Sequence, residues 1–259
     1  MRVVAVDRDV IVFVSRVWQT TCTAVRAGEE GFVIDSPVYP DELDALPAVL
    51  QQAGFPVSGL LVTHGDWDHL LARQAFPDAS LACAQSTSAR LRAEPGDAQR
   101  RLRSFDAEHY VERSAPLSLA HIQELPVPGR LALGSDHELE LYPADGHTAD
   151  GVAYWLVWLG VLVCGDYLSP VEIPMISAGG SLESYRATLQ RLRPLVERAE
   201  RVVPGHGTPQ SRDRTLAVLE ADLGYLDSLA EKGPDAPLPD GRRSAAQRRI
   251  HDDNARAVA

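Results

Sequence analysis

The feature that most constrains the fold of this chain is a short apolar run that leads directly into a cluster of polar side chains. Leu61-Val62-Thr63 is followed by His64-Gly65-Asp66-Trp67-Asp68-His69, which contains four potential metal ligands within six residues. Divalent ions of the zinc, iron and manganese group bind imidazole and carboxylate groups that converge on one point. The pattern therefore predicts a buried strand whose loop carries part of a metal site.

Three later segments repeat this design of a strand, a glycine and one His or Asp. Asp145-Gly146-His147-Thr148 follows a strand that ends at Tyr142, Cys164-Gly165-Asp166 ends an apolar strand, and Pro204-Gly205-His206-Gly207 follows a short strand. Glycine suits a backbone that turns tightly at a crowded site. A single His or Asp in a loop is usually a surface residue or a helix cap. Four such segments, each after a strand, predict a shared site.

Strand-rich and helix-rich stretches alternate along the chain in two similar halves. Runs rich in β-branched residues predict strands, and apolar residues three or four apart predict helices. The predicted strands cover 3–6, 10–14, 21–25, 31–34, 59–63, 80–84, 131–133, 138–142, 151–158 and 161–164. The predicted helices cover 41–53, a stretch from His69 to Pro77, 182–196, 212–230 and 242–258. Periodicity alone thus indicates a mixed α and β protein.

Charge and cysteine content restrict the class of partner and the compartment. The formal net charge of −11 disfavours nucleic acid and anionic membranes as partners, because both would repel the chain. No run of 18 apolar residues and no secretory signal is evident. Cys22, Cys83 and Cys164 are scattered, which is typical of reduced thiols. We therefore expect a cytoplasmic protein that acts on a small molecule.

The order of these motifs resembles that of the metallo-β-lactamase superfamily. The matching segments are His-x-Asp-x-Asp-His, Gly-His-Thr, Gly-Asp and Pro-Gly-His-Gly, and they extend from His64 to Gly207. The resemblance implies an α/β protein with an αββα four-layer sandwich and metals at one edge of the sheets. We expect this domain to cover 1–230, with an arginine-rich helical insertion at about 86–125. Residues 231–259 would form an extended segment and a short helix packed on the domain.

The resemblance also implies a site for two divalent metal ions, zinc as the first choice and iron or manganese as alternatives. When the family's ligand positions are carried over to this sequence, the resemblance implies that His64, Asp66 and His147 bind the first ion. It implies that Asp68, His69 and His206 bind the second ion and that Asp166 bridges the two. A hydroxide between the ions would be the nucleophile. Asp68 would be the catalytic residue that holds the nucleophile and passes a proton to the leaving group.

The implied activity is that of a metallo-hydrolase that cleaves an ester-type bond, a thioester or a lactone. A closer resemblance to glyoxalase II-like enzymes, which are hydroxyacylglutathione hydrolases, comes from Gly-His-Thr, Pro-Gly-His-Gly and a helix beginning Ser181-Leu182-Glu183-Ser184-Tyr185. Lactonase-like activity is the alternative substrate class that the resemblance implies. A phosphodiesterase or nuclease is disfavoured by the negative charge.

Asp66 departs from the common pattern, in which this position is histidine. The extra carboxylate should lower the Lewis acidity of the first ion and favour harder ions such as iron or manganese. An oxygen-reducing di-iron branch of the superfamily also has an acidic residue here, so a di-iron oxidoreductase or dioxygenase is an alternative. That branch normally adds a flavin-binding domain, for which the chain after His206 is short. A metal-depleted binding protein without catalysis is the third possibility.

Several further residues leave two readings open. The arginines of the insertion could contact an acidic substrate or form a solvated helix face, as Arg90, Arg92 and Arg113 illustrate. His251 could touch substrate or a metal ligand, or only pack a terminal helix. By resemblance Asp35 lies near the site, although it could simply form a turn. We expect Trp67 to fill space beneath the ligand loop and the other histidines, His109, His121 and His137, to lie at the surface.

Overall fold

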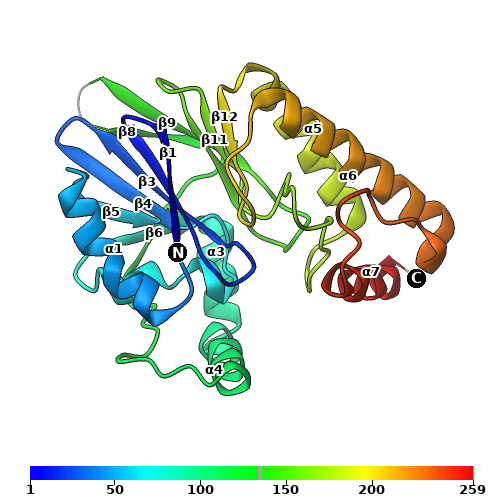
Figure 1. Ribbon diagram of the computed structural model, residues 1–259, viewed down its shortest axis with the longest axis horizontal. Coiled ribbons are helices and arrows are strands. Elements are labelled where there is room, and N and C mark those ends of the chain that lie inside the picture. The colour runs from blue at the N-terminus through cyan, green and yellow to red at the C-terminus, as the bar shows by residue number, and fades with distance from the viewer. Residues whose placement is uncertain (134–135, 259) are drawn as a thin grey trace.

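The computed structural model describes residues 1–133 and 136–258, and the strands in these residues form two sheets packed face to face (Figure 1). The seven-stranded sheet consists, in spatial order, of β1 (Arg2–Asp7), β2 (Val10–Val14), β3 (Thr21–Ala27), β4 (Glu30–Asp35), β5 (Gly59–Leu61), β6 (Leu81–Ala84) and β7 (Ile122–Leu125). The five-stranded sheet consists, in spatial order, of β12 (Arg201–Val203), β11 (Val161–Val163), β10 (Val152–Leu156), β9 (His137–Pro143) and β8 (Gly129–Leu133).

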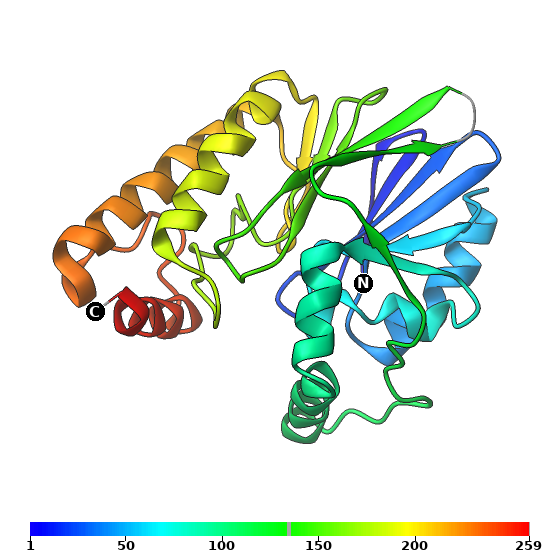
Figure 2. The ribbon, with the colours of Figure 1, turned by 180° about the vertical axis from the view of Figure 1, so that it is seen from behind.

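Helices lie on the outer sides of both sheets, as the two opposite views show (Figures 1 and 2). The helices beside the first sheet are α1 (Pro40–Gln52), α2 (Ala72–Ala75), α3 (Gln85–Ala93) and α4 (Asp97–His109). Those beside the second sheet are α5 (Leu182–Arg198) and α6 (Arg212–Lys232), and α7 (Ala245–Val258) packs against the end of α6 and the short turn that follows it (Figure 1). Two short 3-10 turns cover Trp67–His69 and Gly233–Asp235. Within the described residues, no helix combines the length and apolar character needed to cross a bilayer.

Alternating side chains on the strands create the core between the sheets. On β2, Val10, Val12 and Val14 join the cluster between the sheets, whereas Phe13 faces the cluster beneath the helices of the first sheet. On β10, Tyr154 faces the other sheet and Trp155 faces α5 and α6. Since successive residues of a strand point to opposite faces, a strand covered on both sides must be apolar throughout. The αββα sandwich expected from the sequence is confirmed.

Strand directions bring the ends of several strands to one edge of the sandwich. β5 runs parallel to β4, and β12 runs parallel to β11. β9 and β11 are both antiparallel to β10, so they share a direction. Backbone hydrogen bonds join the two sheets at this edge, from Val152 N to Thr63 O at 2.8 Å and from Thr21 N to Gly205 O at 2.7 Å. The four loops singled out in the sequence all leave strands at this joined edge.

The insertion differs from its predicted form in one respect. Residues 86–125 contain most of α3, all of α4 and also β7, which pairs in parallel with β6 and extends the first sheet. The sequence analysis expected only helix and loop here. The strand was missed because Gln123 and Glu124 are exposed at the edge of the sheet and remove the apolar pattern.

The helix predicted after His69 is also shorter, since α2 covers only four residues.

Candidate metal centre

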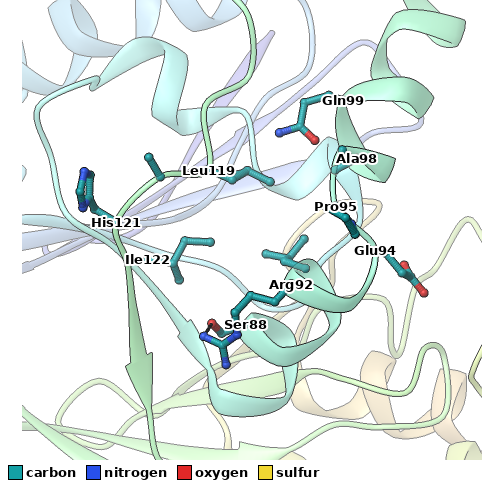
Figure 3. A pocket seen from close by; sticks show the side chains of 12 residues that line it. Ser88, Arg92, Glu94, Pro95, Ala98, Gln99, Leu119, His121 and Ile122 are labelled. Carbon is teal, nitrogen blue, oxygen red and sulfur yellow. Dashed lines mark hydrogen bonds between the residues drawn. The ribbon is translucent and has the colours of Figure 1, made fainter.

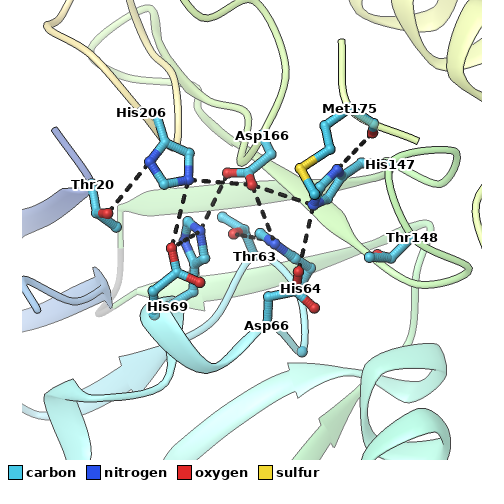
Figure 4. Close-up of polar contacts among 12 residues, drawn as sticks. Thr20, Thr63, His64, Asp66, His69, His147, Thr148, Asp166, Met175 and His206 are labelled. Atoms are coloured by element: carbon cyan, nitrogen blue, oxygen red, sulfur yellow. Dashed lines mark hydrogen bonds and ion pairs between the residues drawn. The ribbon is translucent and has the colours of Figure 1, made fainter. Parts of the chain in front are cut away.

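All seven candidate ligands meet at the edge where the two sheets join (Figure 4). Their ligand atoms fall into three groups, each with its atoms within 4.8 Å of one another: His64 with Asp66 and His147, His64 with His69 and Asp166, and Asp68 with His69 and His206. The first and third groups coincide with the two ligand sets expected from the resemblance. The structure therefore brings together every predicted site residue.

Asp166 lies at the centre of this cluster. Its Oδ2 is 3.3 Å from His147 Nε2, 3.4 Å from His206 Nε2 and 3.6 Å from His64 Nε2. Its Oδ1 is 3.3 Å from His69 Nε2. The carboxylate thus faces both ligand sets at once, which is the placement required of a bridging ligand.

Each histidine directs its Nε2 inward because its Nδ1 is already occupied. The Nδ1 atoms of His64 and His147 lie 3.1 Å from Thr63 Oγ1 and 2.8 Å from Met175 O. The Nδ1 of His206 lies 3.2 Å from Trp18 O and 3.3 Å from Thr20 Oγ1. Partners of this kind fix the ring orientation and tautomer of metal-binding histidines.

Asp35 is the Nδ1 partner of His69 and also accepts hydrogen bonds from the ligand loop. Its Oδ2 lies 3.0 Å from His69 Nδ1, and its two oxygens accept hydrogen bonds from Thr63 N and Thr63 Oγ1, both at 2.8 Å. Asp35 is buried at the end of β4, where its backbone φ of +59° turns the chain. The sequence analysis placed this residue near the site, and the structure shows which ligand it holds.

The inner atoms of the cluster lack the partners that buried polar groups normally have. His64 Nε2, His69 Nε2, His147 Nε2 and Asp166 Oδ1 are buried, and none makes a hydrogen bond within the described residues. Most buried polar atoms in folded proteins have a hydrogen-bond partner. Imidazole nitrogens and carboxylate oxygens aimed at one another across 3.3–3.6 Å are the donor set that divalent ions take. The residues present therefore fit a metal site.

The charge of the cluster also favours a cation. Burial opposes protonation of His147, but Asp66 and Asp166 outweigh it and raise the pKa of this ring to about 9. Burial opposes protonation of His206 as well, yet Glu172 and Asp166 raise its pKa to about 10. The surrounding carboxylates thus attract positive charge strongly, and either protons or metal ions can supply it.

Two arginines of the insertion contact Oδ1 of Asp66, the oxygen that does not face the other candidate ligands. Arg90 on α3 reaches Asp66 Oδ1 at 2.7 Å and Asp150 Oδ1 at 2.8 Å. Arg101 on α4 lies 3.3 Å from the same Asp66 oxygen. The other oxygen, Asp66 Oδ2, faces inward at 3.7 Å from His147 Nε2.

Arg90, Arg92 and Arg113 each pair with a carboxylate of the protein, and none of the three belongs to the wall of the cavity beside the candidate ligands. Arg90 and Arg113 are mostly buried, so they are not a solvated helix face either. Arg113 binds Asp106 and the carbonyl of Val38. Arg92 is exposed and pairs with Glu124.

Two glycines allow the loops to approach this closely. A Cβ on Gly205 would stand 2.1 Å from Asp166 Oδ1, and one on Gly146 would stand 2.2 Å from Tyr185 N. Real Cβ atoms do not come this near to other atoms, so any larger residue would push a ligand loop out of place. The sequence analysis attributed these glycines to a crowded site, and the contacts agree with that reading.

A cavity of about 270 Å³ opens onto the cluster. Its wall includes Trp18 and Trp67 on one side, Ile250 of α7 on the other, and the exposed cations Arg101 and Arg249. Trp67 also packs beneath the ligand loop, as expected, with its ring 4.9 Å from that of Phe105. The cavity is therefore apolar in part and positively charged in part, next to the candidate ligands.

A larger cavity of about 670 Å³ lies away from the cluster, between α3, the start of α4 and the chain before β7 (Figure 3). Leu119, Ile122 and Ala98 line it together with Ser88 and Gln99. None of the seven candidate ligands contributes to its wall. Of these two cavities, the smaller one adjoins the candidate ligands.

The remaining histidines have other contacts. His251 lies 3.0 Å from both Tyr225 Oη and Pro234 O, so it fastens α7 to α6 and takes no part in the wall of the cavity. This settles the choice left open in the sequence analysis. His109 stacks on Phe105 and His137 on Trp158. His121 is exposed, and none of these three belongs to the groups of candidate ligands found in the described residues.

Solved structures with the same architecture include several metallo-β-lactamases. DIM-1 metallo-β-lactamase exposed to ceftazidime aligns with a TM-score of 0.59 and 19% identity over 85% of this chain and 96% of its own. The metallo-β-lactamase from Pontibacter korlensis aligns with a TM-score of 0.61 and 21% identity over 85% and 98%. TTHA1623 in a di-iron-bound form aligns with a TM-score of 0.62 and 21% identity over 78% and 94%.

The sequence itself gives the more specific assignment. No curated protein matches it. The family model described as the metallo-beta-lactamase superfamily matches residues 15–206, which span the strands of both sheets that carry the site and all seven candidate ligands. The chain therefore belongs to the metallo-β-lactamase superfamily, a family of metal-dependent hydrolases.

Proposed function

We propose that this protein is a hydrolase that holds two divalent ions and cleaves an ester-type bond, with thioesters and lactones as the first substrate classes to test. The observation that supports this most is the convergence of four inward-facing Nε2 atoms around Asp166. His64, Asp66 and His147 would hold one ion, Asp68, His69 and His206 the other, and Asp166 both.

Ions at these positions would supply an activated water near neutral pH and a Lewis acid for the scissile carbonyl. Asp68 is the side chain best placed to handle the protons of the reaction. Its Oδ2 lies 3.6 Å from the Nε2 atoms of both His69 and His206. From there it can orient the attacking water and deliver a proton to the leaving group.

The cavity supports a small substrate with an apolar part and a negative charge. Trp18, Trp67 and Ile250 offer apolar surface, and Arg101 and Arg249 offer positive charge at the opening. A volume of about 270 Å³ fits a small acyl compound. A small-molecule partner is therefore proposed in place of nucleic acid, which the net charge of −11 also disfavours.

Removing either positive charge at the opening should weaken binding of an anionic substrate. We expect Arg249→Met to raise KM by roughly 5–30-fold, since a charged hydrogen bond contributes about 1–2 kcal/mol, and to change kcat little. Arg101→Met should raise KM by a similar factor and should also lower kcat, because Arg101 lies 3.3 Å from Asp66 Oδ1. Arg248→Met is the matched control, because Arg248 is an exposed neighbour on α7 outside the cavity. Unchanged KM values in both variants would refute the anionic substrate.

Elemental analysis combined with a substrate screen tests the proposed activity. The purified protein should contain about two divalent ions per chain and hydrolyse thioesters, lactones or both, in preference to phosphodiesters. Zinc is the first expectation, and the di-iron form of TTHA1623 supports including iron in the metal panel. Bound iron with oxygen consumption and no hydrolysis would favour a di-iron oxidoreductase. Less than one ion per chain and no turnover would favour a binding protein.

A further inference from the structure

Asp66 presents only one of its two oxygens to the candidate metal centre. Arg90 Nη2 lies 2.7 Å from Oδ1, and Arg101 Nη1 lies 3.3 Å from the same atom. Asp66 Oδ2 faces His147 Nε2 at 3.7 Å. The carboxylate is therefore oriented so that a cation would meet it through Oδ2.

Arg90 is fixed independently of Asp66. Its second nitrogen, Nη1, lies 2.8 Å from Asp150 Oδ1, and Asp150 Oδ2 accepts a hydrogen bond from Gly65 N at 2.9 Å. The side chain of Asp150 is 1% exposed and that of Arg90 is 13% exposed. A planar guanidinium can bridge two carboxylates in this way, which an ammonium group cannot do with the same geometry. The ligand loop is thus tied to α3 directly at Asp66 and through Asp150 at Gly65.

The same contact changes the charge of the ligand. A neutral imidazole is the usual ligand at this position of the superfamily, whereas Asp66 carries one negative charge. Arg90 carries one positive charge at hydrogen-bond distance and in a mostly buried setting, where screening by water is weak. Arg90 therefore offsets part of the negative charge of Asp66, since it also pairs with Asp150 at 2.8 Å and with Glu94 at 3.5 Å.

We propose that Arg90 is a positioning residue that makes Asp66 a ligand through one oxygen only and offsets part of its negative charge. The pair takes the place of the imidazole usual at this position. This inference depends on the proposed metal-dependent function, because it concerns how Asp66 binds the ion. The competing explanation is that Arg90 only joins α3 to Asp150 and has no influence on the metal.

The two explanations differ in how substitutions of Arg90 and Asp66 combine. Arg90→Met alone should weaken Zn²⁺ binding by about 10–100-fold, the usual effect of losing a group that orients a metal ligand. Asp66→His alone should also weaken it by about tenfold or more, because the new imidazole and its ion would lie beside the guanidinium of Arg90, which Asp150 at 2.8 Å and Glu94 at 3.5 Å still hold in place. The double variant Asp66→His/Arg90→Met should bind Zn²⁺ within about tenfold of wild type, because the two effects cancel.

The experiment measures Zn²⁺ stoichiometry and affinity of the full chain by competition with a chromophoric chelator. The absorption spectrum of the Co²⁺-loaded protein is the second readout, since it reports ligand geometry directly. Arg92→Met is the matched control, because Arg92 is two residues away on α3 and pairs with Glu124 outside the site. Arg90→Lys covers the case in which Arg90→Met does not fold. It keeps the charge but not the bridge, so it should shift the Co²⁺ spectrum and weaken Zn²⁺ binding less than Arg90→Met.

The outcomes separate this inference from the proposed function. Two ions per wild-type chain, with a double variant that recovers affinity and an unaltered Arg92→Met, support the inference. A double variant as weak as the product of the single effects, or wild-type affinity and spectrum in the Arg90 variants, overturns it and leaves the proposed function standing. A wild-type chain that binds no ion overturns the proposed function itself.

Discussion

Replacing Asp35 by asparagine tests whether the groups behind the histidines control metal binding. The side chain of Asp35 is 2% exposed and lies 3.0 Å from His69 Nδ1. A carboxylate at this position accepts the Nδ1 proton, which leaves the lone pair of Nε2 free to bind an ion. Asparagine has the same shape but presents an NH₂ group that can donate to Nδ1. The ring proton would then move to Nε2 and block the ligand atom.

The expected size of the effect follows from this change of tautomer. Asp35→Asn should weaken divalent-ion binding by about 10–100-fold, or about 1.4–2.7 kcal/mol, as is typical for partners of metal-bound histidines. The hydrogen bond that Thr63 N gives to Asp35 Oδ1 can be kept by the amide oxygen, so the loop should still fold. Loss of metal affinity should therefore exceed loss of stability.

Two measurements on the same variant separate these effects. Competition with a chromophoric chelator gives the affinity for Zn²⁺, and chemical denaturation of the metal-free protein gives the free energy of unfolding. Asp9→Asn is the matched control, because Asp9 is a carboxylate paired with Arg26 in the turn between β1 and β2, far from the ligands. Wild-type metal affinity in a folded Asp35→Asn variant would refute the proposed control of His69.

Two further predictions concern crowding and pH. Gly205→Ala should reduce bound metal to one ion or none and destabilise the fold by about 1–3 kcal/mol, because its Cβ would meet Asp166 Oδ1 at 2.1 Å. The control Gly224→Ala has open space on α6 and should stabilise the fold by about 1 kcal/mol. Denaturation and elemental analysis check both variants, and full metal occupancy in Gly205→Ala would contradict the packing argument. In the metal-free protein the pKa values of His147 and His206 are raised to about 9 and about 10, so the stability that their protonated rings contribute is complete below about pH 6.5 and is lost as the pH rises through these values. The melting temperature of the metal-free protein, measured by scanning calorimetry, should therefore decrease as the pH is raised from about 7 to about 10. Ion binding near pH 7 should release protons, which titration calorimetry detects. A flat stability profile without proton release would count against these pKa values.

The candidate ligands could be predicted from the sequence because each follows a strand within a few residues. His64, His147, Asp166 and His206 all lie just beyond apolar runs, and strands with a common direction deliver their ends to one edge. The continuous apolar sequences of β2 and β10 likewise predict strands that are covered on both faces. Local patterns of this kind survive folding because each is set by neighbours in the chain.

Other features depend on contacts between distant segments, and no local pattern indicates them. Arg90 meets Asp66 across 24 residues and Asp150 across 60 residues of sequence. The way in which α3 lies across the ligand loop decides which carboxylates Arg90 contacts. The arginines of the insertion therefore look alike in the sequence, although Arg90 and Arg101 both contact a candidate ligand and Arg101 also lines the cavity. β7 escaped prediction for a related reason, since pairing with β6 rather than apolar character makes it a strand.

The pairing of Asp66 with Arg90 changes the argument about metal preference. In the sequence, the extra carboxylate lowers Lewis acidity through its charge and thereby favours iron or manganese. In the structure, that charge faces a guanidinium at 2.7 Å that is shared with Asp150 and Glu94, so the effect of the charge is reduced. What remains besides this reduced charge is the hardness of an oxygen donor compared with a nitrogen donor, which is a smaller and more local effect. The preference among zinc, iron and manganese should therefore depend on donor type and geometry as well as on charge, and it should shift toward the harder ions when Arg90 is removed and Arg101, 3.3 Å from Asp66 Oδ1, is the remaining cation beside this carboxylate.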